Sequence, residues 1–416
     1  MDDQAFTPRT LAGLLRQSDR IAHPSIKDPS SAKTVLKAAA RLARQEPVLL
    51  GGKMSTSLVR GKRVNVVTDL SLELVLRKLN SNLRLALRLR DRSRDTLVRT
   101  LCEALRDSCA YVIFRLDIKS FYESVDSGRV REKLTLNQVL SPTSVRLLDN
   151  IVRWHHSSGG VGLPRGVSVS ATLADLHMSG FEQKISRLKE VSYAWRFADD
   201  IVIICDSNTA PATALNKIKT ALPNELKLNS SKTKHSPISK LTEKARDKDG
   251  KTAAIVEYLG YEITVRNPTA AEEGRQIEVD IAKKKVNRTK TRITLSLLDF
   301  TKNGDFALLE NRIKLITSNY TILDKNGKFK RPAGIYYSYP LVTKLDKGSL
   351  DSLDKFMRCA LLSGQGPIFS KVKATITQRQ TRRLLKMTFR SGFCDRREFD
   401  FSPSLISKIQ ECWKYA

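Results

Sequence analysis

Three aspartates are the residues of this sequence best suited to chemistry. Asp117 ends one apolar run, and Asp199 and Asp200 stand together in a short turn between two others. If those runs form neighbouring strands, the carboxylates meet at one end of a sheet and could hold two divalent ions about 3.5–4 Å apart. Such ions activate a hydroxyl, orient a phosphate and stabilise a leaving pyrophosphate, which is nucleotidyl transfer. An Asp-Asp pair alone more often caps a solvated hairpin, so the pair by itself leaves both interpretations open.

The segments around these aspartates predict the elements that must position them. Runs rich in β-branched and aromatic residues predict strands over 110–116, 192–197 and 201–205. Between the first two strands, a glycine-rich turn over 159–166 leads into a predicted helix over 168–184, with Ser168 or Ser170 as its cap. Two carboxylates at the tip of an apolar hairpin are costly to bury without a positive partner.

The charge of the chain predicts a polyanionic partner. The 416 residues contain 73 Lys and Arg against 43 Asp and Glu, which gives a formal net charge of +30. A surface of this sign usually faces polyphosphate, so nucleic acid is the first partner to expect, and a basic scaffold protein is the alternative. Helical periodicity with arginines on one face covers 72–105, and Lys and Arg also stud a helical stretch over 283–292. Linkers are expected near Pro268 and over 325–332.

Several classes of protein are disfavoured by the same sequence. The six cysteines form no C-x-x-C pair, so neither a disulfide framework nor a structural zinc site is expected. The longest apolar stretches, such as 201–205, are too short to span a bilayer, and the acidic start Met1-Asp2-Asp3 does not suit a secretory signal. A cytoplasmic protein without a membrane partner is therefore expected. The neighbours His155 and His156 lack further ligands at metal spacing and are interpreted as ordinary residues at a helix end.

Five segments, in order, resemble the palm of reverse transcriptases. They are Leu-Asp-Ile-Lys-Ser-Phe-Tyr at 116–122, Gly-Leu-Pro-Arg-Gly at 162–166, Phe-Ala-Asp-Asp at 197–200, Leu-Asn-Ser-Ser-Lys-Thr at 228–233 and Tyr-Leu-Gly-Tyr at 258–261. The resemblance covers about 110–265, and with the fingers about half of the chain. It implies an α+β right-hand polymerase fold with fingers, an antiparallel-sheet palm and a helical thumb. The corresponding division is an N-terminal extension over 1–60, fingers over 61–109, a palm over 110–270 that includes fingers elements, and a helical thumb with a basic C-terminal region over 271–416.

The resemblance also implies a role for each matching residue of the catalytic centre. Asp117, Asp199 and the backbone carbonyl of Ile118 would hold two Mg²⁺ ions, with Mn²⁺ as an alternative, and Asp200 would support the turn as a third catalytic aspartate. Tyr122 would lie under the incoming sugar and favour dNTP over NTP because its ring clashes with a 2′-hydroxyl. Its neighbour Phe121 is a second candidate nucleotide contact, for which plain core packing is preferred.

Further nucleotide contacts follow from the other motifs. Gly162 would allow the backbone to approach the nucleotide closely. Arg165 stands where many relatives carry Gln, so it could add a phosphate or template contact while the usual amide contact is lost. Lys232 would lie near the triphosphate as a proton donor to pyrophosphate, with a solvated surface charge as the equal alternative. One or two fingers arginines should clamp the β- and γ-phosphates, and Arg92, Arg88 and Arg84 are the candidates in that order.

Nucleic acid would be bound by the thumb and by the segment after the palm motifs. The candidates are Lys283, Lys284, Arg288 and Arg292 on the basic helix, with a solvated helix face as the alternative, and Leu259 and Gly260 in the primer-grip segment. The implied partners are an RNA template, dNTPs and the DNA product.

The pattern Gly-Leu-Pro-x-Gly-x-x-x-Ser-x-x-Leu-Ala at 162–174 looks most like defence-associated and abortive-infection reverse transcriptases of bacteria. That resemblance, with thumb sequence like that of type 3 defence systems, implies antiviral defence, a cognate noncoding RNA and, in some systems, a second reverse transcriptase. The alternatives are a non-catalytic RNA-binding scaffold on the same fold, a retron-like or group II-like enzyme, and an RNA-directed RNA polymerase, which Tyr122 disfavours. The sequence leaves the oligomeric state open.

Overall fold

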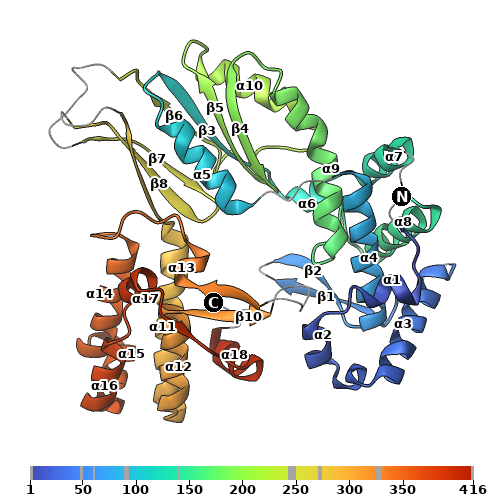
Figure 1. The fold of residues 1–416 in the computed structure, drawn as a ribbon. Coiled ribbons are helices and arrows are strands. Elements are labelled where there is room, and N and C mark those ends of the chain that lie inside the picture. The colour runs from blue at the N-terminus through green and yellow to red at the C-terminus, as the bar shows by residue number, and fades with distance from the viewer. Residues whose placement is uncertain are drawn as a thin grey trace. The chain divides into compact units, whose positions relative to one another are not determined.

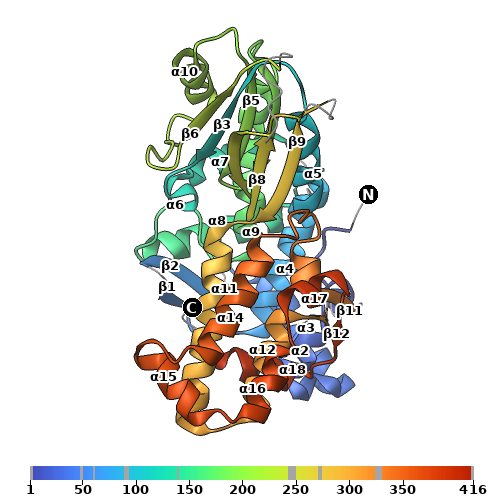
Figure 2. The same cartoon turned by 90° about the vertical axis from the view of Figure 1, so that its left-hand side faces the viewer.

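The computed structural model describes residues 3–46, 50–59, 61–88, 93–137, 140–241, 250–269, 274–323 and 330–413. The chain divides into two compact units (Figures 1 and 2). The first unit comprises residues 1–93, 109–240 and 325–328, and the second comprises 94–108, 241–324 and 329–416. Each unit is therefore assembled from segments that are far apart in the sequence.

A four-stranded antiparallel sheet in the order β4-β5-β3-β6 is the centre of the first unit. Its strands are β3 (Tyr111–Asp117), β4 (Val191–Phe197), β5 (Asp200–Asp206) and β6 (Lys234–Ile238). The predicted strands over 110–116, 192–197 and 201–205 are confirmed to within one residue. The middle strands β3 and β5 are almost continuously buried, which explains why their sequences are apolar runs rather than alternating patterns.

Helices surround this sheet and share one buried cluster with it. The helical elements of the first unit are α1 (Pro8–Ala12), α2 (Gln17–Ala22), η1 (Pro24–Lys27), α3 (Pro29–Arg44), α4 (Leu70–Ala86), α6 (Phe121–Ser124), α7 (Ser127–Asn137), α8 (Pro142–Ser157), α9 (Ser168–Ile185) and α10 (Pro211–Ala221). A hairpin of β1 (Met54–Val59) and β2 (Lys62–Val67) completes the unit. The residues interpreted as an N-terminal extension belong to this core, because Phe6, Leu11 and Leu42 are buried in the same cluster as Leu74 of α4.

Two three-stranded sheets and a set of helices make up the second unit. The sheets are β7 (Thr252–Tyr258), β8 (Tyr261–Arg266) and β9 (Gln276–Ile281), and β11 (Lys330–Gly334), β10 (Asn319–Leu323) and β12 (Glu398–Phe399). The helical elements are α5 (Arg94–Leu105), α11 (Lys283–Asn303), α12 (Phe306–Thr317), α13 (Ile335–Ser338), α14 (Ser349–Leu362), α15 (Gly366–Thr375), α16 (Gln378–Leu385), α17 (Phe389–Cys394), α18 (Pro403–Gln410) and η3 (Glu411–Trp413).

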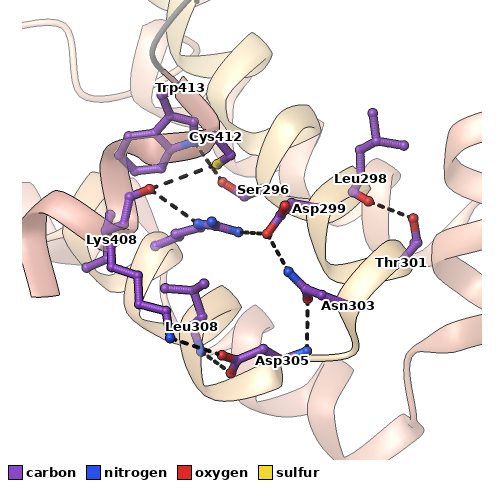
Figure 3. Close-up of polar contacts among 12 residues, drawn as sticks. Ser296, Leu298, Asp299, Thr301, Asn303, Asp305, Leu308, Lys408, Cys412 and Trp413 are labelled. Carbon is purple, nitrogen blue, oxygen red and sulfur yellow. Dashed lines mark hydrogen bonds and ion pairs between the residues drawn. The ribbon is translucent and has the colours of Figure 1, made fainter.

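A polar network fastens the last described residues to α11 and α12 (Figure 3). Arg312 is buried and donates to Asp299, which also accepts a hydrogen bond from Asn303 at 2.8 Å. The indole nitrogen of Trp413 donates to the hydroxyl of Ser296 at 2.9 Å. A buried guanidinium is costly unless it is paired, so this network fixes how α18 and η3 pack on the long basic helix.

Two expectations about the elements need correction. The helix expected over 168–184 is α9, but its N-cap is Val167, and neither predicted serine caps it: Ser168 is its first residue and Ser170 donates to the carbonyl of Pro164 at 2.6 Å. Pro268 lies between two strands of one sheet, β8 and β9, and is not a linker between domains. The basic segment over 72–105 is two helices, and α5 groups with the second unit by its contacts. Among the helices that the structure describes, none is long and apolar enough to cross a membrane.

Candidate active site

The end of the central sheet brings the three aspartates together. Asp117 is the last residue of β3, and its partner in the register with β5 is Asp200. Ala198 and Asp199 form the two-residue loop of the β4–β5 hairpin, and the amide of Ile118 donates to the carbonyl of Asp199 at 3.4 Å. Two segments far apart in the sequence therefore present their carboxylates at one sheet end, as the spacing predicts.

The turn that carries Asp199 is strained and is held by a buried arginine. Ala198 has a φ of +54°, the value of the first central position of a type II′ turn, where glycine is preferred. Arg196 is only 7% exposed and donates to the carbonyl of Ala198 at 3.1 Å. The same guanidinium bonds Asp175 at 3.0 Å and Glu182 at 2.8 Å, both on α9. Arg196 thus ties the turn to the helix, a role that the sequence signals only as a charge within an apolar strand.

The carboxylates of the three aspartates concentrate negative charge at this end of the sheet, which favours binding of a cation. Burial and the charge of Asp117 raise the pKa of Asp199 above its usual range. The ammonium of Lys232 lies 3.0 and 3.1 Å from the two carboxylate oxygens of Asp117, and a guanidinium nitrogen of Arg115 lies 3.8 Å from Asp200. The carboxylates of Asp117 and Asp200 therefore each have a basic side chain of this protein beside them.

The donor set suits a hard divalent ion, although it is not preassembled. Carboxylate and carbonyl oxygens are the ligands that Mg²⁺ prefers. Among the described residues, however, no three His, Cys, Asp or Glu side chains are grouped closely enough to form a metal site. Asp117 pairs with Lys232, and Asp200 lies near Arg115. The residues fit Mg²⁺ in kind and in charge.

Lys232 is delivered by a loop that lies against the end of β3. The amide of Asn229 donates to the carbonyl of Asp117 at 2.7 Å, and the amide of Lys119 donates to the carbonyl of Lys227 at 2.9 Å. The side-chain amide of Asn229 reaches a carboxylate oxygen of Asp117 at 3.3 Å. The loop motif at 228–233 is thus part of the aspartate cluster, as its order in the sequence suggests.

Tyr122 lies beside the aspartates on the one-turn helix α6. Its ring is half-buried, in edge contact with Phe121 at 5.5 Å between centroids. Burial, together with the charge of Asp199, raises the pKa of Tyr122. Phe121 is 1% exposed and belongs to the buried cluster, in agreement with core packing rather than a nucleotide contact.

Two glycines of the glycine-rich loop lie so close to neighbouring backbone that no side chain would fit at either position. A Cβ on Gly162 would lie 2.3 Å from the carbonyl oxygen of Tyr122, and one on Gly166 would lie 2.1 Å from the carbonyl oxygen of Asn65. Both glycines have positive φ, +68° and +88°. The amide of Leu163 donates to the carbonyl of Tyr122 at 2.8 Å. The loop therefore fixes the backbone beneath the Tyr122 ring.

The two neighbouring histidines hold the same loop. His156 donates from Nε2 to the carbonyl of Gly162 at 3.1 Å, and His155 donates from Nε2 to the carbonyl of Val161 at 3.3 Å. Asn65 completes the set, because its amide nitrogen lies 3.4 Å from Nδ1 of His155. Burial lowers the pKa of His155, which favours the neutral ring with its proton on Nε2. The sequence interpretation placed these residues at a helix end but missed that they bind the loop.

The structure places two of the three fingers arginines at the end of α4. Arg84 is in the last turn of α4 and Arg88 lies just after it, while Arg92 lies outside the described residues. Asn82, two residues before Arg84, donates to Ser144 in the first turn of α8. Besides Lys232 and Arg115, a third basic residue near the site is Lys62 of the β1–β2 hairpin, 3.1 Å from the hydroxyl of Ser120.

The candidate nucleic-acid contacts lie in the second unit. Leu259 and Gly260 form the loop of the β7–β8 hairpin, both with positive φ, and the carbonyl of Gly260 accepts from the amide of Ala282 at the start of α11. The first turns of α11 expose Lys283, Lys284 and Arg288. Arg292 differs, because its guanidinium is half-buried over the ring of Trp413, 5.4 Å from the centroid, and burial lowers its pKa. Of the four cations expected on α11, the three nearest its start are therefore the exposed ones.

Comparison with known proteins places the aspartate cluster inside a described family. Residues 53–263, just over half of the chain, match the family model described as Reverse transcriptase (RNA-dependent DNA polymerase). No curated protein matches the sequence. One similar solved structure is that of apo telomerase from Candida tropicalis, truncated from its C-terminal domain, at 15% identity and a TM-score of 0.33. The match covers 51% of this chain and 53% of that one, so the chain spans about half of that telomerase chain.

Proposed function

Because this chain belongs to the reverse transcriptase family, we propose that it copies RNA into DNA, adding dNTPs to a 3′-hydroxyl. The family match and the antiparallel sheet with its surrounding helices confirm the expected α+β right-hand polymerase fold. The single observation that carries the proposal is the meeting of Asp117 and Asp199 at the end of the β3–β5 pair, inside the matched residues. We further propose fingers over 61–109, a palm over 110–270 and a thumb over 271–416.

The proposed chemistry assigns a role to each residue of the cluster. Asp117, Asp199 and the carbonyl of Ile118 would hold two Mg²⁺ ions, which when bound supply positive charge at the attacking hydroxyl and at the leaving pyrophosphate. Asp200, paired with Arg115, supports the turn. Lys232, which pairs with Asp117, would give a proton to the pyrophosphate as the bond to the α-phosphate breaks. Arg196 holds the strained turn in place, and the histidine-bound glycine loop holds the backbone of Tyr122.

The thumb would bind the template and primer without reading their sequence. The exposed cations Lys283, Lys284 and Arg288 suit phosphate contacts, and Leu259 and Gly260 suit close approach of backbone to the primer. The partners proposed are an RNA template, dNTPs and a DNA product.

A purified-protein assay tests the activity. With Mg²⁺, labelled dNTPs and a primed RNA template, the wild type should extend the primer, and chelation of Mg²⁺ should stop extension. A protein that binds the primed RNA but extends it with neither dNTP nor NTP would instead support the non-catalytic scaffold. Preference for NTP would support an RNA-directed RNA polymerase.

Tyr122→Ala is expected to relax sugar selection. Removing the half-buried ring beside Asp199 makes room for a 2′-hydroxyl, so the ratio of kcat/KM for dNTP to that for NTP should fall roughly 10- to 100-fold. Single-nucleotide incorporation with each substrate measures this ratio. Tyr193→Ala is the matched control, because it removes an exposed tyrosine from β4 of the same unit. Equal ratios in wild type and Tyr122→Ala would show that another residue is the gate.

The biological role proposed is bacterial antiviral defence, in the cytoplasm, with a cognate noncoding RNA and in some settings a second reverse transcriptase. The support is the loop-and-helix pattern at 162–174. Sequencing the nucleic acid that co-purifies with the wild type, and comparing phage plaque counts on cells carrying wild type or Asp199→Asn, tests the role separately from the activity. Plaque counts that are equal in the two strains would contradict it.

A further inference from the structure

Arg165 is fixed at both its backbone and its side chain. Its carbonyl accepts hydrogen bonds from the backbone amide and the side-chain amide of Asn65 at 2.8 and 3.2 Å. Its guanidinium makes two parallel hydrogen bonds to the carboxylate of Glu123, at 2.6 and 2.9 Å. Such a fork is the strongest and most directional pairing available to arginine. The side chain is therefore engaged within the protein rather than extended toward a phosphate or the template.

The fixed guanidinium lies over the face of the Tyr122 ring, 5.0 Å from its centroid. The backbone beneath the ring is already pinned, since the carbonyl of Tyr122 accepts from the amide of Leu163. What remains free is rotation of the ring about its own side-chain bonds. A cation held against one face restricts that rotation, because it is attracted to the electron-rich face of the ring.

Lys62 supports the carboxylate from the β1–β2 hairpin. Its ammonium lies 3.8 Å from Glu123 and donates to the hydroxyl of Ser120 at 3.1 Å. Ser120 has a φ of +48° and begins the turn that carries Tyr122. Three elements, the hairpin, the glycine loop and α6, thus converge on one carboxylate. We name Lys62, Glu123 and Arg165 the gate clamp.

We propose that the gate clamp holds the Tyr122 ring in the position that rejects a 2′-hydroxyl, so that Arg165 and Glu123 are positioning residues for sugar selection. This inference rests on the proposed polymerase function and adds that selectivity depends on an ion pair outside the nucleotide's own contacts. A ring that can swing away admits a 2′-hydroxyl, so loss of the clamp should strengthen NTP binding and lower the KM for NTP.

Arg165→Lys tests the clamp because lysine keeps the charge but has neither the fork nor the flat face. The ratio of kcat/KM for dNTP to that for NTP should fall roughly 5- to 20-fold, mainly through a lower KM for NTP. Glu123→Gln should lower this ratio by a similar factor. In the double variant the ratio should be no more than about twofold lower again, since both changes break the same ion pair. Arg131→Lys is the matched control: it alters the Arg131–Asp149 pair at 3.2 Å elsewhere in the first unit and should keep the wild-type ratio.

The ring itself supplies the decisive comparison. In a Tyr122→Ala background, Arg165→Lys should change the ratio no further, because the group that the clamp positions is absent. Wild-type ratios in Arg165→Lys and Glu123→Gln, or a full additional fall in the Tyr122→Ala background, would overturn the inference while leaving the polymerase in place. Failure of the wild type to extend with either nucleotide would instead overturn the function and the inference together. Thermal melting of each variant separates a displaced ring from an unfolded protein.

Discussion

Asp199→Asn should reduce nucleotide incorporation by at least about 10³-fold, because it removes one carboxylate from the pair that would hold the metal ions. The amide has the same shape, so the hairpin and its tie to Arg196 should remain. Since burial and Asp117 raise the pKa of Asp199, the folded protein gains from losing that charge near pH 7, and the melting temperature should stay level or rise. Single-turnover primer extension, RNA binding and thermal melting measure the three effects.

Asp206→Asn is the control for this change. Asp206 ends the same strand at its other end, where its carboxylate accepts from the amide of Asn208 at 2.8 Å. The incorporation rate of the Asp206→Asn variant should stay within about twofold of the wild-type rate. If Asp199→Asn also lost RNA binding and stability, Asp199 would be structural. If it extended primers at the wild-type rate, the assignment of the metal ligands would be wrong.

Gly162→Ala is expected to have the second largest effect, a loss of stability of roughly 2–4 kcal/mol together with most of the activity. Two costs combine: the positive φ of +68° and a Cβ only 2.3 Å from the carbonyl oxygen of Tyr122. Because backbone rather than a flexible side chain is in the way, the loop or α6 must shift, and Tyr122 shifts with it. Denaturant unfolding and primer extension measure the two losses.

Two other glycines separate these costs. Gly61 has a φ of +71° but open space around it, so Gly61→Ala should show only the backbone cost of about 1–2 kcal/mol. Gly180 lies in α9 with ordinary φ and open space, so Gly180→Ala should stabilise the protein by about 0.5–1 kcal/mol. A Gly162→Ala protein no less stable than Gly61→Ala would show that the close approach is not real in solution.

The local elements and the meeting of the aspartates could be predicted from the sequence. The apolar runs that end at Asp117 and beside Asp199 are typical of paired buried strands. The order of the motifs indicated the family. Side-chain partners could not be predicted in the same way. Arg165 was expected near phosphate or template because many relatives carry Gln at this position. Nothing in the nearby sequence indicates that Glu123, which precedes α7 and α8, offers it two oxygens.

The same limit explains the other residues that sequence reasoning missed. Arg196, His155 and Lys62 act through partners on other elements, and their roles exist only once the sheet, α8 and the hairpin are assembled. The expected serine cap of α9 failed because the N-cap is Val167, so Ser168 and Ser170 already lie within the first turn, where the hydroxyl of Ser170 donates to the carbonyl of Pro164. The fingers arginines were chosen from a run whose register with the family slides, and Arg92 lies outside the described residues.

The segments of the two units alternate along the sequence, which constrains where the chain can be divided into fragments for expression. Helix α5, with Val98, Leu101 and Leu105 fully buried, is synthesised early but groups with a unit whose remaining residues begin at 241. A fragment that ends before residue 241 therefore contains α5 without most of the unit with which the helix groups. No single cut yields two self-sufficient fragments, so expressing the first unit alone calls for replacing 94–108 by a short polar connector rather than stopping at residue 240.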